Sequence, residues 1–177
     1  WPSDRQSGRG DVRVHEVRDR RAHGAAPSGE DDAEGWTALR IGHGVAESGT
    51  DFGPGDAFPH DVSFDQNAGV DFRKGCFVGQ EVVSRMQHRG TARRRLVIAS
   101  AEAPDFAPGA ALEAGGKPVG TLGSVAGGSA LALVRLDRAK KAMDAGVPIT
   151  AGGQTVTLSL PSNVSYRWPE NTGTEGD

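Results

Sequence analysis

ALEAGGKPVGTLGSV, residues 111–125, is the stretch that decides the fold of this 177-residue chain. It joins two short apolar runs through the pair Gly115-Gly116. A glycine pair between such runs is a strong signal for a tight hairpin, because both turn residues need positive φ. The stretch therefore predicts two antiparallel strands, at 111–114 and 117–125.

The sequence on both sides of this hairpin continues the same pattern. Apolar runs of strand length alternate with turn residues, and the pairs Gly127-Gly128 and Gly152-Gly153 mark two more turns. Further strands are expected at 95–99, 130–135, 147–150 and 155–160. Short strands with regular glycine turns are typical of a small antiparallel barrel.

The remaining predicted elements are helical or irregular. We expect helices at 34–45, 79–88 and 137–145, a loop at 46–60 and a short strand at 70–72. In the second helix, Val82, Val83 and Met86 have the spacing of one buried stripe, and Asp137 is expected to cap the third. The fold class is therefore α+β, with a partial α+β region before a C-terminal barrel.

The composition narrows the range of functions. The net charge of −3 gives no general attraction to nucleic acid, and one cysteine excludes an intrachain disulfide or a Cys-only metal site. No apolar run approaches the roughly 20 residues that span a bilayer. Residues 1–35 contain no Leu, Ile, Phe, Met or Tyr, so we expect this segment to be poorly ordered.

The densest chemistry lies in KGCFVGQE, residues 74–81, which holds the only cysteine. Gly75 permits close approach of a partner to the backbone. Lys74 and the helix that starts just after Cys76 favour the thiolate over the thiol. The alternative interpretation is that Cys76 is a small buried hydrophobic residue, with Gln80 and Glu81 as ordinary helix-start residues.

Other candidate groups carry weaker signals. The basic run around Arg85 and 93–95 is either a solvated face or an anion-binding rim; a nucleic-acid surface would prefer interleaved aromatic residues. The pairs His60-Asp61 and His43 with Asp51 show no firm metal-ligand spacing. We therefore expect no stably bound metal.

KGCFVGQE and its continuation to Arg93 resemble the signature of the YgfZ-type folate-binding proteins. Residues 36–41 (WTALRI) and 56–61 (DAFPHD) are similar to the same family. These proteins are relatives of the glycine-cleavage T-protein, an aminomethyltransferase, and act in iron–sulfur cluster assembly or repair. The resemblance covers about residues 36–170.

The resemblance implies a division of the chain and a ligand. It predicts a divergent segment at 1–35, a remnant of the T-protein-like folate domain at 36–92, the barrel at 93–162 and a polar tail at 163–177. It implies an N-terminally truncated protein that binds tetrahydrofolate. Cys76 would be the functional thiol, and the folate-binding residues would be Lys74, Gly75, Gln80, Glu81, Arg85 and Arg40.

The implied function is an accessory role in iron–sulfur cluster assembly or repair. One cysteine cannot hold a cluster alone, so the expected partners are assembly proteins or client enzymes, with no nucleic acid or membrane. The alternative is a folate-dependent aminomethyltransferase. The family's folate-contacting glutamate position is Gly42 here, which argues against that enzyme. The expected location is the cytoplasm in a bacterium or the mitochondrial matrix in a eukaryote.

Overall fold

The computed structural model describes residues 32–75, 78–89, 92–102, 105 and 107–170. Contacts divide the chain into two units, Trp1–Asp31 and Asp32–Asp177, and the second carries all the elements described below. The segment expected to be poorly ordered therefore lies, up to residue 31, outside the described residues.

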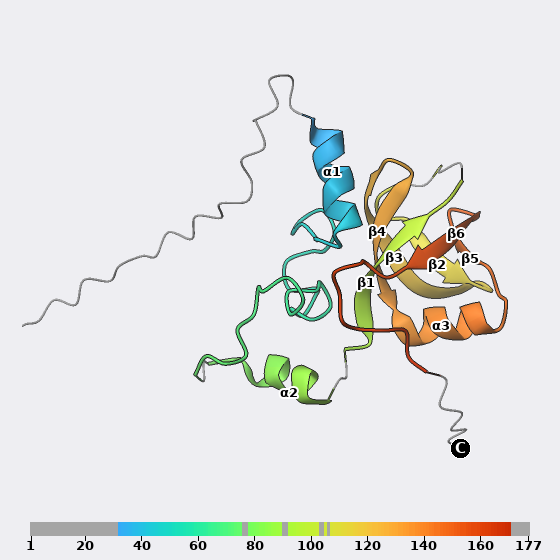
Figure 1. Cartoon of the computed structure of the whole chain (residues 1–177). Helices are drawn as coiled ribbons and strands as arrows, with labels where there is room; N and C mark the ends of the chain where they lie inside the picture. The colour runs from blue at the N-terminus through green and yellow to red at the C-terminus, as the bar shows by residue number, and fades with distance from the viewer. Residues whose placement is uncertain (1–31, 76–77, 90–91, 103–104, 106, 171–177) are drawn as a thin grey trace, which may run out of the picture. The chain divides into compact units, whose positions relative to one another are not determined.

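Six antiparallel strands form a closed barrel in the order β1-β4-β3-β2-β5-β6 (Figure 1). Each strand therefore has two hydrogen-bonded neighbours, and the expected α+β fold with a small C-terminal barrel is confirmed. The strands are β1 (Arg94–Ser100), β2 (Ala111–Ala114), β3 (Lys117–Ala126), β4 (Ser129–Arg135), β5 (Ile149–Ala151) and β6 (Gln154–Ser159).

The three glycine pairs make the three hairpins that the sequence predicts. Strand pairing closes on Ala114↔Lys117, Ala126↔Ser129 and Ala151↔Gln154. All six glycines between these partners have positive φ, from 56° to 88°. Side chains other than glycine rarely adopt this conformation, so the glycine pairs fix the register.

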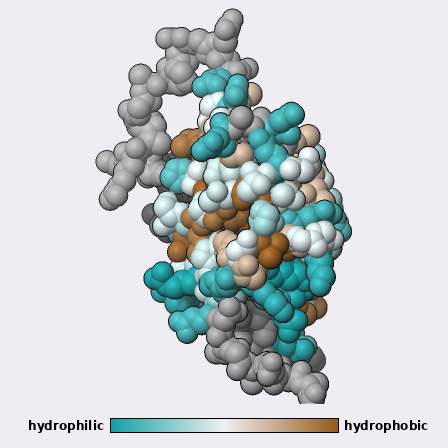
Figure 2. Space-filling model, turned by 90° about the vertical axis from the view of Figure 1, so that its right-hand side faces the viewer, coloured by the Kyte–Doolittle hydropathy of each residue, from teal (hydrophilic) through white to brown (hydrophobic). Residues whose placement is uncertain are grey.

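The barrel has an apolar interior and one covered outer face. In β1, Val97 and Ala99 point into the main core, whereas Leu96 lies in a second cluster with Ile41 and Leu131. This is the period-2 alternation of a strand buried on both faces. Seen from the side where β5 and β6 lie, hydrophobic residues gather in the middle of the face and hydrophilic residues surround them (Figure 2).

Helix α1 (Ala33–Gly42) covers the outside of the barrel. Asp32 caps it by accepting a hydrogen bond from the Gly35 amide at 2.7 Å. Its residue Ile41 is 1% exposed in the second cluster. Trp36 remains 63% exposed, so the helix is anchored mainly by its last turn.

Helices α2 (Glu81–Arg89) and α3 (Leu136–Asp144) confirm the two other predicted helices, with differences in detail. Val82 is 45% exposed, so the predicted buried stripe of α2 is wrong at that residue. The N-cap of α3 is Arg135, which makes no side-chain cap bond, so the predicted cap by Asp137 is also wrong. Asp137 lies in the first turn and accepts two hydrogen bonds from Arg135.

The segment between α1 and α2 is a long connection tied down by polar contacts. The predicted strand at 70–72 is wrong, because these residues pair with no strand in the described chain. Three apolar or aromatic residues in alternation are too short a pattern to outweigh the turns around them.

Three arginine–aspartate pairs attach this connection to the rest of the chain. They are Arg40–Asp51 at 2.8 Å, Arg94–Asp61 at 2.6 Å and Arg95–Asp65 at 2.8 Å. Each aspartate side chain is at most 3% exposed. A buried carboxylate must be paired, so these contacts fix the path of the connection.

A register shift in β3 makes room for one of these pairs. Between Leu122 and Val125 the ladder with β4 is irregular, and a bulge of this kind re-aims side chains locally. Ser124 donates its amide hydrogen to Asp51 at 2.6 Å and accepts a hydrogen bond from Arg40 at 2.7 Å.

The segment after β6 also contacts the barrel, although its sequence predicts a polar tail. Tyr166 donates a hydrogen bond to the Leu96 carbonyl at 2.6 Å, and the Arg95 guanidinium lies 4.7 Å from the centre of its ring. Trp168 packs against the main core. Burial raises the pKa of Tyr166 above its ordinary value.

Candidate functional site

A pocket of about 260 Å³ opens beside the KGCFVGQE motif. One wall comes from the segment before the cysteine and the other from α2. Its lining residues are Pro59, Val70, Asp71, Phe72, Lys74, Gln80, Val83, Ser84, Gln87 and His88.

The helical period decides which side of α2 faces this pocket. Gln80, Val83, Ser84, Gln87 and His88 follow one another at intervals of three, one, three and one. Residues with this spacing lie on one face of a helix. The α2 wall of the pocket therefore carries amide, hydroxyl and imidazole groups, and Val83 is its aliphatic side chain.

His60 links the two walls. Its Nε2 lies 3.1 Å from the Gln87 Oε1 atom, and its ring centroid lies 5.9 Å from that of Phe72. The Gln87 oxygen accepts hydrogen bonds, so Nε2 is the donor in this contact. The His60 Nδ1 atom is buried without a hydrogen-bond partner among the described residues.

The predicted site residues divide into three groups, of which the first borders the pocket. Lys74 and Gln80 line it, two residues before and four residues after Cys76. Cys76 itself lies outside the described residues. A Cβ atom on Gly75 would meet nothing within 4 Å, so in the described structure this backbone is open to a ligand.

Glu81 and Arg85 form the second group, on another face of α2. They pair with each other one helical turn apart, with side chains 79% and 57% exposed, and neither lines the pocket. An exposed pair of this spacing contributes a few tenths of a kcal/mol to a helix. Their assignment to a folate site stays a prediction.

Arg40 is the third case, and its contacts are internal. It is 7% exposed and donates hydrogen bonds to Asp51, Ser124 and the Val45 carbonyl. These contacts hold α1 to the barrel. The geometry therefore gives Arg40 a structural role, and its contact with folate stays a prediction.

The sequence did not reveal that Phe72 and Gln87 line this pocket or that His60 contacts both of them. From the sequence alone, His60 is a candidate metal ligand and Phe72 is part of a predicted strand. Among the described residues, no three His, Cys, Asp or Glu side chains gather as a metal site requires. The sequence pattern that could have identified this wall of the pocket is the helical spacing of Gln80, Ser84 and Gln87, which predicts one polar face.

Comparison with known proteins places the barrel in a family. Residues 93–166 match the family described as "CAF17, C-terminal beta-barrel domain". In the described part of the chain, no helix has the length and apolar character needed to cross a membrane.

Two curated relatives carry the name "Iron-sulfur cluster assembly factor IBA57 homolog, mitochondrial". The protein from Mycosarcoma maydis is 47% identical over 73 residues, which are 41% of this chain and 18% of that protein. The one from Neosartorya fischeri is 36% identical over 114 residues, 59% of this chain and 25% of that protein. The chain thus spans a quarter or less of the length of these two relatives.

One solved structure is also similar, the glycine cleavage system aminomethyltransferase T from Bartonella henselae. It is 20% identical, with a TM-score of 0.48 over 71% of this chain and 36% of that one.

Residues 93–166 therefore form a barrel of the type described as the CAF17 C-terminal domain. Parts of the chain are also similar to two proteins named IBA57 homologs.

Proposed function

We propose that this protein acts in iron–sulfur cluster assembly or repair as a tetrahydrofolate-binding accessory protein, with Cys76 as its functional thiol. One observation carries the proposal. In a chain whose relatives are named iron–sulfur cluster assembly factors, a pocket opens beside the cysteine motif, and Lys74 and Gln80 of that motif line it.

The pocket suits part of a folate rather than the whole molecule. Sites for drug-sized ligands usually measure about 300–1,000 Å³, and this pocket measures about 260 Å³. Phe72, which is 42% exposed, offers a ring for stacking on the pterin. Gln80 offers hydrogen bonds to the edge of that ring, and Lys74 offers a charge to a glutamate carboxylate. Bound tetrahydrofolate would supply one-carbon or redox chemistry.

Cys76 can supply only one of the protein ligands that an iron–sulfur cluster needs. Iron–sulfur clusters usually take four protein ligands, and this chain has one cysteine. Cys76 therefore handles a cluster only together with ligands from an assembly protein or a client enzyme. Because the relatives are named mitochondrial, we propose the mitochondrial matrix as the compartment.

The proposal is tested by the alkylation rate of Cys76 against pH, with and without tetrahydrofolate. The single cysteine makes the signal unambiguous. We expect a thiol that titrates below the ordinary value of about 8.5 and is protected by folate. Lys74→Ala and Gln80→Ala should each weaken the protection, whereas Arg167→Ala, outside the pocket lining, should not. A thiol indifferent to folate contradicts the binding proposal.

A cellular assay separates folate binding from the role of the thiol. Cys76→Ser should lower the activity of iron–sulfur enzymes in cells that depend on this protein. If Cys76→Ser does not change the activity of these enzymes, a functional thiol is excluded, and the folate-binding part of the proposal is not affected. Nothing in the described structure favours the aminomethyltransferase alternative, and turnover of a folate one-carbon donor would be the result that restores it.

A further inference from the structure

A groove with basic walls crosses the outside of the barrel, away from the cysteine motif. It consists of two adjoining pockets of about 360 and 630 Å³. Both are lined by Pro118, Val119 and Arg138, so they adjoin at these residues, and we call the two together the barrel groove. Neither pocket shares a lining residue with the pocket beside the motif.

The larger half lies between α3 and the β2–β3 hairpin. Arg138, Lys141, Ala142 and Ala145 of its lining follow helical spacing, so they form one face at the α3 side. The hairpin contributes Lys117, and the lining also includes Val119 and Val147. Three cations and no carboxylate line this half.

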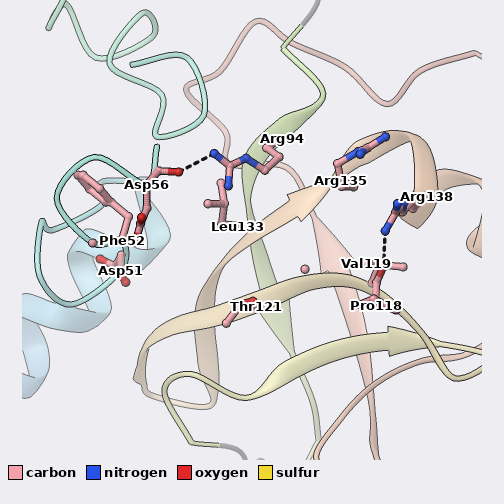
Figure 3. A pocket seen from close by; sticks show the side chains of 12 residues that line it. Asp51, Phe52, Asp56, Arg94, Pro118, Val119, Thr121, Leu133, Arg135 and Arg138 are labelled. Atoms are coloured by element: carbon pink, nitrogen blue, oxygen red, sulfur yellow. Dashed lines mark hydrogen bonds between the residues drawn. The ribbon is translucent and has the colours of Figure 1, made fainter. Parts of the chain in front are cut away.

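The smaller half continues along β3 and β4 (Figure 3). Figure 3 shows Arg135 and Arg138 on one side of the pocket, and Asp51 and Asp56 on the opposite side. Asp51 is already paired with Arg40. Among the described lining residues, the carboxylates therefore lie at the far end. At the α3 end Arg135 is paired with Asp137, which does not line the pocket, and Lys117, Arg138 and Lys141 supply the remaining positive charge.

The arginines at the α3 end keep hydrogen-bonding capacity. Arg138 donates one bond, from Nη1 to the Pro118 carbonyl at 3.0 Å, and a guanidinium has five N–H donors. Arg135 holds Asp137 through two of its donors. That pair raises the pKa of Arg135, so its charge persists at every physiological pH.

We propose that the barrel groove binds an acidic peptide segment of a partner protein. Carboxylates of the segment would pair with Lys117, Arg138 and Lys141, and an apolar side chain would rest on Ala145 and Val147, which are accessible in the lining. Charge complementarity selects this occupant: the groove is cationic on a chain with a net charge of −3. A single-stranded nucleic acid is disfavoured, because no aromatic side chain lines the α3 half for base stacking.

The test is fluorescence anisotropy with a short fluorescein-labelled peptide rich in Glu and Asp that carries one central Leu. The same peptide with Lys in place of each acid should not bind. The double variant Lys117→Glu/Lys141→Glu should weaken binding by about tenfold or more, since like charges in contact are strongly unfavourable. Both lysines are exposed, so the fold should persist, and circular dichroism verifies this.

Two controls make the result decisive. Arg167→Glu reverses an exposed charge outside the groove and should leave the affinity unchanged. An oligonucleotide probe should bind more weakly than the acidic peptide. The proposal is overturned if the peptide does not bind, if the groove and control variants behave alike, or if the oligonucleotide binds more tightly.

Discussion

The Asp51 carboxylate is one of the most extensively hydrogen-bonded side chains in the part of the chain described here. It is 2% exposed and accepts hydrogen bonds from Arg40, the Glu47 amide and the Ser124 amide. Through these contacts one side chain joins α1, the loop after it and strand β3. The role of Asp51 is structural. Its carboxylate provides the buried Arg40 guanidinium with a paired charge.

Asp51→Ala should therefore destabilise the protein by up to about 3–5 kcal/mol, because it leaves the buried Arg40 charge with only the exposed Glu47 carboxylate, 3.3 Å away, as an ionic partner. Urea denaturation measures the change. Glu81→Gln is the matched control, since it breaks an ion pair on the exposed surface of α2. We expect it to cost less than about 0.5 kcal/mol. Equal costs for the two variants would contradict the assigned role of Asp51.

Tyr166 is the only tyrosine of the chain, so its ionisation can be followed alone by phenolate absorbance. Burial raises its pKa, and the titration midpoint should lie above the ordinary value of about 10. The folded state then keeps a proton that the unfolded state loses, so stability should fall as pH rises past about 10. Tyr166→Phe should remove this part of the pH dependence. A midpoint at the ordinary value would mean that the ring is hydrated in solution.

The role of Arg40 depends on contacts between residues far apart in the chain, which the sequence does not reveal. Arg40 and Ser124 are 84 positions apart, and no local pattern connects them. The resemblance therefore assigned Arg40 to the ligand, whereas the fold uses it to hold α1. Lys74 and Gln80 were predicted together because they share one short motif, and the pocket does bring both to its lining.

At the scale of elements, the β3–β4 contact depends on a residue without a side chain. A Cβ atom on Gly120 would lie 2.5 Å from the Leu133 carbonyl oxygen and 2.9 Å from the Val134 Cα atom. Both are backbone atoms of the neighbouring strand, so they cannot move aside cheaply.

Gly120→Ala should therefore destabilise the barrel by about 1–3 kcal/mol, in the range of overpacked sites. Gly42→Ala is the matched control, because a Cβ there meets nothing within 4 Å and the residue lies in α1. That variant should be neutral or slightly stabilising, since alanine favours a helix over glycine. Thermal unfolding of both variants measures the difference. A harmless Gly120→Ala would show that β3 and β4 lie further apart than described.

The elements that the sequence predicts well are those with local causes. Glycine pairs demand positive φ, so the three hairpins and the strands beside them were predictable. The strand at 70–72 and the cap at Asp137 were wrong because each depends on its surroundings. Closure of the barrel through β1 and β6 joins Ile98 to Ser159, and nothing local specifies that pairing.

At the scale of the molecule, Asp32–Asp177 forms one unit, and it should unfold in a single transition. The Arg40–Asp51, Arg94–Asp61 and Arg95–Asp65 pairs join the segment before the barrel to α1 and β1. Tryptophan fluorescence and far-UV circular dichroism should therefore give one urea midpoint. In Asp65→Asn the midpoint should fall while the two probes still coincide. Separate midpoints in the unmodified chain would mean that the connection and the barrel unfold independently.

The closed order of the strands limits how another protein can dock on this barrel. Because β1 pairs with both β4 and β6, each of the six described strands has a hydrogen-bonded neighbour on both sides over at least part of its length. A partner therefore meets no strand whose whole edge is open for the addition of another strand, which is how many extended peptides are captured. The same closure removes the template for edge-to-edge aggregation. Recognition at the barrel must instead be carried by side chains, in its grooves and on its loops.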